Sequence, residues 1–273
     1  MRRPFAALLA VATAVALAFL LLPVAAIFVR VPPGDLIGAL GRDVTRDALL
    51  VSLKTSAIAH AAVLVVGTPA AYLLARRGFP GRGLVLTVIE LPLVLPPAVA
   101  GIALFAAFGR AGLLGDELDA VGVQIPFTQA AVVLAVAFVE SPCYLRGAIA
   151  AFEAVDRGLL DAARTLGAGP ARVFTRIALP LAAGGLGAAS ALALARGLGE
   201  FGATIIFAGS LQGVTQTLPL AIYAQFDQDF DTALAISALF IVVGALLLVT
   251  LKLYGWLRFG SIFRSRFAPS LSS

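Results

Sequence analysis

Residues 151–180 read AFEAVDRGLLDAARTLGAGPARVFTRIALP, and they lie between two apolar runs at 127–151 and 181–208. Each run reaches the ~20 residues that a helix needs to cross a hydrocarbon core about 30 Å thick. The stretch between them carries four arginines and is too polar to lie within lipid. The pattern therefore predicts two membrane-spanning helices joined by a long connection outside the hydrocarbon core.

Four more apolar runs of membrane-spanning length lie at 5–29, 50–75, 84–108 and 232–257. The chain is 60% hydrophobic and 13% charged, with a mean hydropathy of +1.01, which is far outside the usual range of soluble domains. We therefore expect an all-α, polytopic membrane protein with about six transmembrane helices. The first run is longer than the 7 to 15 residues of a typical secretory signal core, so we expect an uncleaved helix. Leu95-Pro96-Pro97 predicts a kink in the third span.

The basic residues predict the orientation, because short cytoplasmic loops accumulate Lys and Arg. If the N-terminus is inside the cell, 14 of the 20 basic residues fall in inner segments, whereas the outer 209–231 loop carries three Asp and no basic residue. Both termini are then cytoplasmic. The pI near 10 needs no nucleic acid to explain it, because the excess positive charge is the signal that sets the topology, and it also favours anionic lipid headgroups.

The connection at 152–180 predicts two short amphipathic helices. One helical face of the first carries apolar residues at Leu159, Ala162, Ala163 and Leu166. Gly167 and Gly169 break this helix, and Pro170 suits the first turn of the second. The residues alone leave two interpretations open, a docking element for another protein or a helix pair lying on the membrane surface.

The connection resembles the EAA loop of binding-protein-dependent ABC importer permeases. The family pattern is Glu-Ala-Ala, three residues, Gly, nine residues, Ile, one residue, Leu-Pro, and this chain keeps the spacing through Gly167, Ile177 and Leu179-Pro180. It departs only in having Asp161 for Glu. The resemblance implies a coupling helix that binds a cytoplasmic ATPase through Asp161, Ala162, Ala163, Arg164, Thr165, Leu166 and Gly167.

Residues 50–257 look closest to the molybdate-type permeases of this family. The similar blocks are Leu95–Pro97, Phe108–Gly115, Arg196–Thr204 and Thr215–Tyr223. Sulfate and thiosulfate permeases are similar over the same blocks, and the Gly-Ala-Thr that ends at Thr204 favours the molybdate group. Tungstate has the charge and nearly the size of molybdate, so the sequence does not separate the two.

The resemblance also implies the organisation of the chain and its partners. Residues 1–49 form the first transmembrane helix and an outer loop, 50–257 the ABC importer transmembrane domain, and 258–273 a cytoplasmic basic tail. The chain has no phosphate-binding loop, because neither Lys54 nor Lys252 has a glycine just before it, so we expect no enzyme activity and no cofactor in this chain. Expected partners are a second permease copy, two ATP-binding subunits and an outer solute-binding protein, in a bacterial or archaeal cell (inner) membrane. Sulfate transport would favour a permease heterodimer over the homodimer.

Ionisable residues within the spans are candidates for the transport site, since burying one in lipid costs about 3 kcal/mol. Arg196 and Glu200 are four residues apart on one helical face. They either neutralise each other, or Arg196 lines the anion path while Glu200 holds it in place or belongs to the gate. Thr204 is a further candidate for the pathway or gate. Glu90 and Glu140 stand near prolines, where we expect them to meet freed backbone groups or loop residues.

Two other classes of function are a proton-coupled secondary transporter and a membrane-embedded enzyme. A proton-coupled secondary transporter would use Glu90, Glu140, Glu200 and His60 as a relay, but the halves of the chain show no repeat and the 152–180 connection would have no role. For a membrane-embedded enzyme, the spans of this chain contain no paired aspartates, and we expect no nucleophile that pairs with the lone His60. We expect His60 to be packed or hydrogen-bonded instead.

The glycine-rich fifth span predicts close helix packing around a translocation axis.

Overall fold

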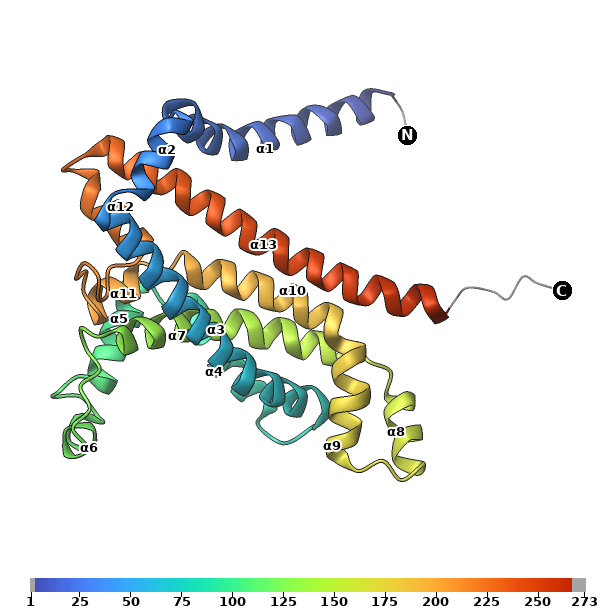
Figure 1. The fold of residues 1–273 in the computed structure, drawn as a ribbon. Coiled ribbons are helices and arrows are strands. Elements are labelled where there is room, and N and C mark those ends of the chain that lie inside the picture. Colours follow the sequence, from blue (N-terminus) through green and yellow to red (C-terminus); the bar gives the residue numbers. More distant parts are fainter. Residues whose placement is uncertain (1–2, 267–273) are drawn as a thin grey trace.

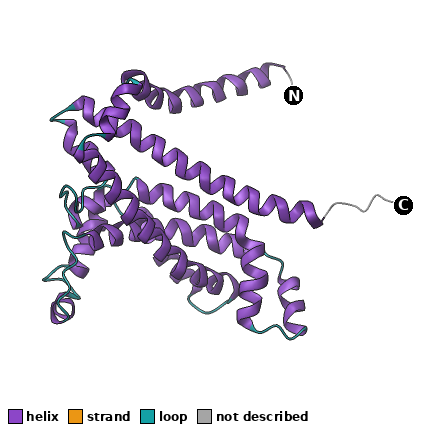
Figure 2. Cartoon of the chain, viewed as in Figure 1, coloured by secondary structure: helices purple, strands orange, loops and turns teal. Residues whose placement is uncertain are grey.

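The computed structural model describes residues 3–266, with side chains for residues 5–250. Every regular element in this part of the chain is helical (Figure 2). The all-α prediction is therefore confirmed. Arg2 and residues 267–273 of the predicted basic tail lie outside the described residues, and the tail's first residues, 258–266, belong to the last helix.

Five helical segments are long and apolar enough to cross a membrane. They are α1 (Arg3–Arg30), α3 (Asp43–Arg76), α7 (Gln129–Glu153), the continuous segment that ends with α10 (Leu179–Leu198), and α13 (Phe230–Arg266). The continuous segment starts with α9 (Pro170–Val173) and passes through a π-helical turn at Phe174–Ala178. Each segment overlaps a predicted run, because length and hydropathy determine a span, although the bounds of the fifth differ from the prediction.

The third apolar run is more strongly bent than the predicted kink. It forms α4 (Arg82–Val94) and α5 (Pro97–Phe108), whose axes differ by 114°. Leu95 is extended because the proline that follows excludes the helical conformation, and Pro97 then begins α5. With this pair taken as one broken span, the described residues contain six spanning segments.

The fifth apolar run is also interrupted, so the prediction of a single span through residue 208 is wrong. α10 ends at Leu198, residues 199–201 are not helical, and α11 (Gly202–Phe207) follows. Glu200 lies in this interruption. Two of the predicted spans are therefore broken within their apolar runs.

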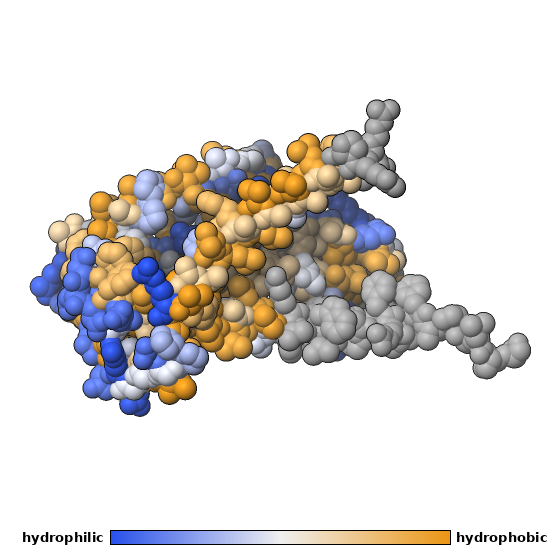
Figure 3. All heavy atoms as spheres, turned by 90° about the horizontal axis from the view of Figure 1, so that it is seen from above, coloured by the Kyte–Doolittle hydropathy of each residue, from blue (hydrophilic) through white to orange (hydrophobic). Residues whose placement is uncertain are grey.

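The elements gather at two ends of an elongated bundle (Figure 1). The helices α8 (Arg157–Thr165) and α9 project at one end, which is also where α1 begins and α13 ends. At the opposite end lie α2 (Pro33–Leu40), α6 (Gly115–Ala120) and α12 (Leu218–Phe226). Hydrophobic side chains cover much of the length between these ends, and hydrophilic ones gather toward the left end in Figure 3.

The helices α3, α7 and α10 form the centre of the bundle. Glycines let them approach closely: an added Cβ at Gly185 would lie 2.5 Å from Ala151, and one at Gly147 would lie 2.6 Å from Ala189. The close packing predicted for the fifth span therefore holds at Gly185. At Gly184 and Gly187, an added Cβ would meet no other part of the described chain within 4 Å.

Candidate functional site

The segment 152–180 contains the predicted break between two helices. Gly167 has φ +85°, a left-handed conformation that glycine adopts without steric cost. Its N–H donates to the carbonyl of Arg164 at 3.0 Å, and the N–H of Ala168 donates to the carbonyl of Ala163 at 3.0 Å. This pair of hydrogen bonds is a Schellman motif, which ends α8 before Pro170 starts the next helix.

The face that α8 turns to the bundle is not the predicted apolar face. Leu160 is 2% exposed and belongs to the core cluster that also contains Phe152 and Val173. By contrast, Leu159 is 52% exposed and Leu166 is 87% exposed. Three of the four residues of the predicted face therefore point away from the protein, and only Ala163 is partly buried. An exposed apolar face at the end of the bundle suits contact with another protein.

Hydrogen bonds and aromatic packing hold this segment in place. The guanidinium of Arg76, at the end of α3, donates to the carbonyls of Phe152 at 2.5 Å and Val155 at 2.8 Å. The ring of Tyr72 packs against Phe152 and Phe174, with ring centroids 5.2 Å and 4.8 Å apart. Contacts of this kind tie both ends of the segment to α3.

The first turn of α8 depends on one capping side chain, Asp156, whose Oδ1 accepts from the N–H of Gly158 at 2.7 Å. We expect Asp156→Ala to destabilise α8 locally by about 1 kcal/mol, the usual cost of losing such a cap. Amide hydrogen exchange in 157–165 should then be about fivefold faster. Asp156→Asn, which keeps an N-cap acceptor, should exchange at the wild-type rate. Equal exchange in all three proteins would contradict this role of Asp156.

Arg196 lies in the last turn of α10, Glu200 in the interruption that follows, and Thr204 in α11. Nη1 of Arg196 donates to Oε2 of Glu200 at 3.0 Å, and the backbone N–H of Ala203 donates to Oε1 at 2.7 Å. The carboxylate of Glu200 is 1% exposed, whereas the Arg196 side chain is 40% exposed. The two residues therefore pair as one interpretation requires, and the guanidinium keeps an accessible side.

The interruption after α10 packs against the broken third span. An added Cβ at Gly202 would lie 2.4 Å from Cβ of Pro97, and one at Gly101 would lie 2.7 Å from Cβ of Ile206. The hydroxyl of Thr204 is fully buried here and has no hydrogen-bond partner among the described residues. Non-helical backbone at membrane depth is tolerated where it is buried in protein or lines a water-filled cavity. Two such breaks in contact make this the candidate transport site.

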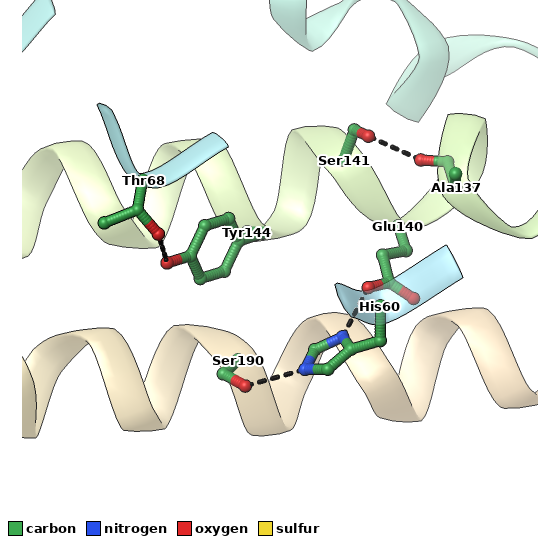
Figure 4. A network of polar contacts seen from close by, with 7 residues as sticks. All are labelled: His60, Thr68, Ala137, Glu140, Ser141, Tyr144 and Ser190. Atoms are coloured by element: carbon green, nitrogen blue, oxygen red, sulfur yellow. Dashed lines mark hydrogen bonds and ion pairs between the residues drawn. The ribbon is translucent and has the colours of Figure 1, made fainter. Parts of the chain in front are cut away.

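The structure also shows a buried polar cluster that was not predicted from the sequence (Figure 4). Nδ1 of His60 in α3 lies 2.5 Å from Oε1 of Glu140 in α7, and Nε2 lies 2.8 Å from Oγ of Ser190 in α10. The predicted hydrogen bonding of His60 is confirmed. The expected partner of Glu140, a freed backbone group or a loop residue, is wrong, because its partner is His60.

A serine next to this histidine also contradicts the expectation that His60 has no nucleophile beside it. Ser190 is only 9% exposed and lies in the middle of α10, between packed helices, as a structural contact would. Glu90, the remaining candidate carboxylate, is not in this cluster. The Glu90 side chain is half exposed, and its Oε1 lies 3.6 Å from Nε of Arg146.

Comparisons with known proteins identify the family. A family profile described as "Binding-protein-dependent transport system inner membrane component" matches residues 67–258. The chain is 46% identical over 232 residues to a molybdenum transport system permease protein of Mycobacterium tuberculosis, with 85% of this chain and 88% of the relative covered. It is 43% identical over 212 residues to a molybdenum transport system permease protein of Escherichia coli, with 77% and 92% covered.

A solved structure supports the fold independently. It is the crystal structure of a bacterial alginate ABC transporter in complex with an alginate pentasaccharide-bound periplasmic protein, with a TM-score of 0.72 at 16% identity, covering 92% of each chain. The family profile and the two relatives confirm the predicted resemblance to ABC importer permeases. The chain belongs to the family of binding-protein-dependent transport system inner membrane components, and it is a multi-pass membrane protein of that family.

Proposed function

We propose that this chain is the permease subunit of an ATP-driven importer that moves molybdate across the cell membrane. The observation that carries the proposal is the similarity to molybdenum permeases, 46% identity across 85% of the chain. The segment 152–180 supports it, because α8 is fixed to the bundle and presents Leu159 and Leu166 outward. Docking an ATPase there explains this exposed apolar face better than a position on the membrane surface.

The proposed assembly has two copies of this chain, two ATP-binding subunits and an outer solute-binding protein. ATP is bound by the separate subunits, so this chain carries no cofactor and catalyses no reaction. The residues that contact the ATPase are Asp161, Ala162, Ala163, Arg164, Thr165, Leu166 and Gly167. The end of the bundle that carries α8 then lies in the cytoplasm, and the start of α1 and the end of α13 lie at the same end (Figure 1). This arrangement supports the proposal that both termini are cytoplasmic.

The proposed path passes the interruption at 199–201. Molybdate is a tetrahedral dianion, and a guanidinium offers it several N–H donors and a positive charge. Arg196 is 40% exposed even while it is paired with Glu200, so it can meet an anion without breaking that pair. The carboxylate beside it weakens anion binding at this point. A weak site suits a permease, because the solute-binding protein captures the anion and the permease must release it.

Uptake of labelled molybdate at nanomolar concentration tests the proposed substrate. We compare cells with and without the gene, and add excess tungstate or excess sulfate as competitor. The expected result is gene-dependent uptake that tungstate blocks and sulfate does not. Gene-independent molybdate uptake together with lost sulfate uptake would contradict the proposed substrate and assign the chain to the sulfate permeases.

A further inference from the structure

His60, Glu140 and Ser190 join the three central helices at one point. Glu140 is fully buried, and His60 and Ser190 are each 9% exposed. With Glu140 as a carboxylate, Nδ1–H of His60 donates to Oε1, and Nε2 accepts from the Ser190 hydroxyl (Figure 4). One neutral imidazole thus satisfies one partner on each side, and α3 is hydrogen-bonded to α7 and α10 simultaneously. We call these three residues the clamp.

The clamp approaches α10 at a second position, through the other carboxylate oxygen of Glu140. This oxygen, Oε2, would lie 2.5 Å from a Cβ added at Gly197, so only a glycine allows the carboxylate to lie this close to the helix. Gly197 directly follows Arg196 in the sequence. The clamp therefore reaches from the middle of α10 to the residues of the candidate transport site.

The clamp joins the two helices that flank the segment 152–180. Glu140 lies 13 residues before the end of α7 at Glu153, a distance of about 20 Å along a helix. Ser190 lies within the continuous helical segment that starts at Pro170, and Arg196 follows six residues later, about 9 Å along the helix. A movement that begins at α8 and α9 must pass the clamp to reach Arg196 and Glu200.

Stability alone does not account for the clamp. Hydrogen bonds between transmembrane helices contribute little to stability on average, and buried polar groups are retained in some proteins because they fix the register between helices. The clamp fixes the register, because sliding α10 by one turn, about 5.4 Å, would separate Ser190 from His60. An apolar contact at the same position would permit such sliding.

We propose that the contact of His60 with Glu140 and Ser190 makes α3, α7 and α10 one rigid unit, which transmits movement of the segment 152–180 to the Arg196–Glu200 end of α10. This inference rests on the proposed function because it requires an ATPase partner. It does not require that the substrate is molybdate. His60, Glu140 and Ser190 are positioning residues, since they act through the helices and touch no substrate.

Two spin labels test rigidity without any substrate. Cys143 is the only cysteine in the chain, so Cys143→Ala provides a cysteine-free background. The labels are attached at Ile58→Cys in α3 and Leu192→Cys in α10, where the native side chains are 49% and 64% exposed. The full complex is measured in nanodiscs by double electron–electron resonance, with labelled chains diluted by unlabelled ones, without nucleotide and with ATP and vanadate. We expect the same Ile58–Leu192 distance in both states. In Ser190→Ala we expect it to shift or broaden by about 2 Å, a typical helix displacement.

The chain supplies two matched controls, both visible in Figure 4. Tyr144→Phe removes the 2.6 Å hydrogen bond between the hydroxyls of Tyr144 and Thr68, which joins α3 to α7 but leaves α10 untouched. Ser141→Ala removes a 2.5 Å hydrogen bond within α7. Both controls should keep the wild-type distance in both states. A wild-type distance that changes by more than about 2 Å, or a Ser190→Ala distance that stays constant, would overturn the proposal.

A second readout separates transmission from simple stability. In proteoliposomes that contain the full complex, Ser190→Ala should lower the molybdate transported per ATP hydrolysed about fivefold, the ratio expected for the loss of one hydrogen bond. Ser141→Ala and Glu140→Gln, which keeps an acceptor for Nδ1–H, should keep the wild-type ratio. An unchanged ratio in Ser190→Ala would argue against transmission. A complex that transports no molybdate but shows the expected distances would contradict the substrate and leave the clamp intact.

Discussion

Replacing Gly167 with tryptophan is expected to reduce ATP-driven uptake to background while the permease remains folded in the membrane. A left-handed conformation costs most L-amino acids about 1–2 kcal/mol, so a tryptophan at φ +85° strains the end of α8. Within this chain the space around Gly167 is open, with no atom within 4 Å of an added Cβ. In the proposed assembly, the bulk of the indole would therefore clash with the ATPase and with nothing in the permease.

Copurification of the ATPase with the tagged permease measures this effect directly. Gly78→Trp is the matched control, because Gly78 also has no atom within 4 Å of an added Cβ but lies between α3 and α4, outside the docking segment. Gly167→Asn separates strain from bulk, since asparagine tolerates the left-handed conformation. We expect Gly78→Trp and Gly167→Asn to keep the ATPase. Gly167→Trp should lose at least about nine-tenths of the bound ATPase, which corresponds to a loss of about 1.4 kcal/mol or more in binding free energy. Retention of the ATPase by Gly167→Trp would place the docking surface elsewhere.

The sequence predicts the spans well because a span depends on local quantities. Each long helix needs only enough consecutive apolar residues, and 232–257 shows this well, since α13 covers the whole run. The break between α8 and α9 is predictable for the same reason: Gly167 and Pro170 determine it within four residues. Features of this kind need no knowledge of tertiary contacts.

The sequence predicts less about features that depend on packing. The apolar character of residues 199–208 hides an interruption that is stabilised by Glu200, which accepts from the N–H of Ala203. The sequence predicts which residues of α8 form an apolar face, but it does not predict whether that face points toward the bundle. In the structure Leu160, rather than Leu159, packs against the bundle. Ser190 carries no signal, because its contact with His60 depends on the register between α3 and α10, helices separated by more than 100 residues.

The second large effect is expected at Arg196, where replacement by glutamine should lower molybdate uptake at least about tenfold. Removing one member of a buried ion pair costs about 3–5 kcal/mol, because the remaining charge is left without a partner. The carboxylate of Glu200 is 1% exposed and would keep only the N–H of Ala203. The partial exposure of Arg196 reduces this cost, so part of the folded protein should persist. Arg146→Gln is the control, since Arg146 faces Glu90 with both side chains largely exposed, and it should transport normally.

The double variant Arg196→Gln with Glu200→Gln distinguishes the two interpretations of the pair. The neutral amide at 200 keeps an acceptor for the N–H of Ala203 and removes the buried charge, so the amount of folded protein should return to the wild-type level. If Arg196 only neutralises Glu200, uptake should return with it. We expect uptake to stay low instead, because the amide at 196 offers a dianion no positive charge. Folding that recovers without transport would assign the guanidinium to the anion path, and recovery of both would make the pair a purely structural contact.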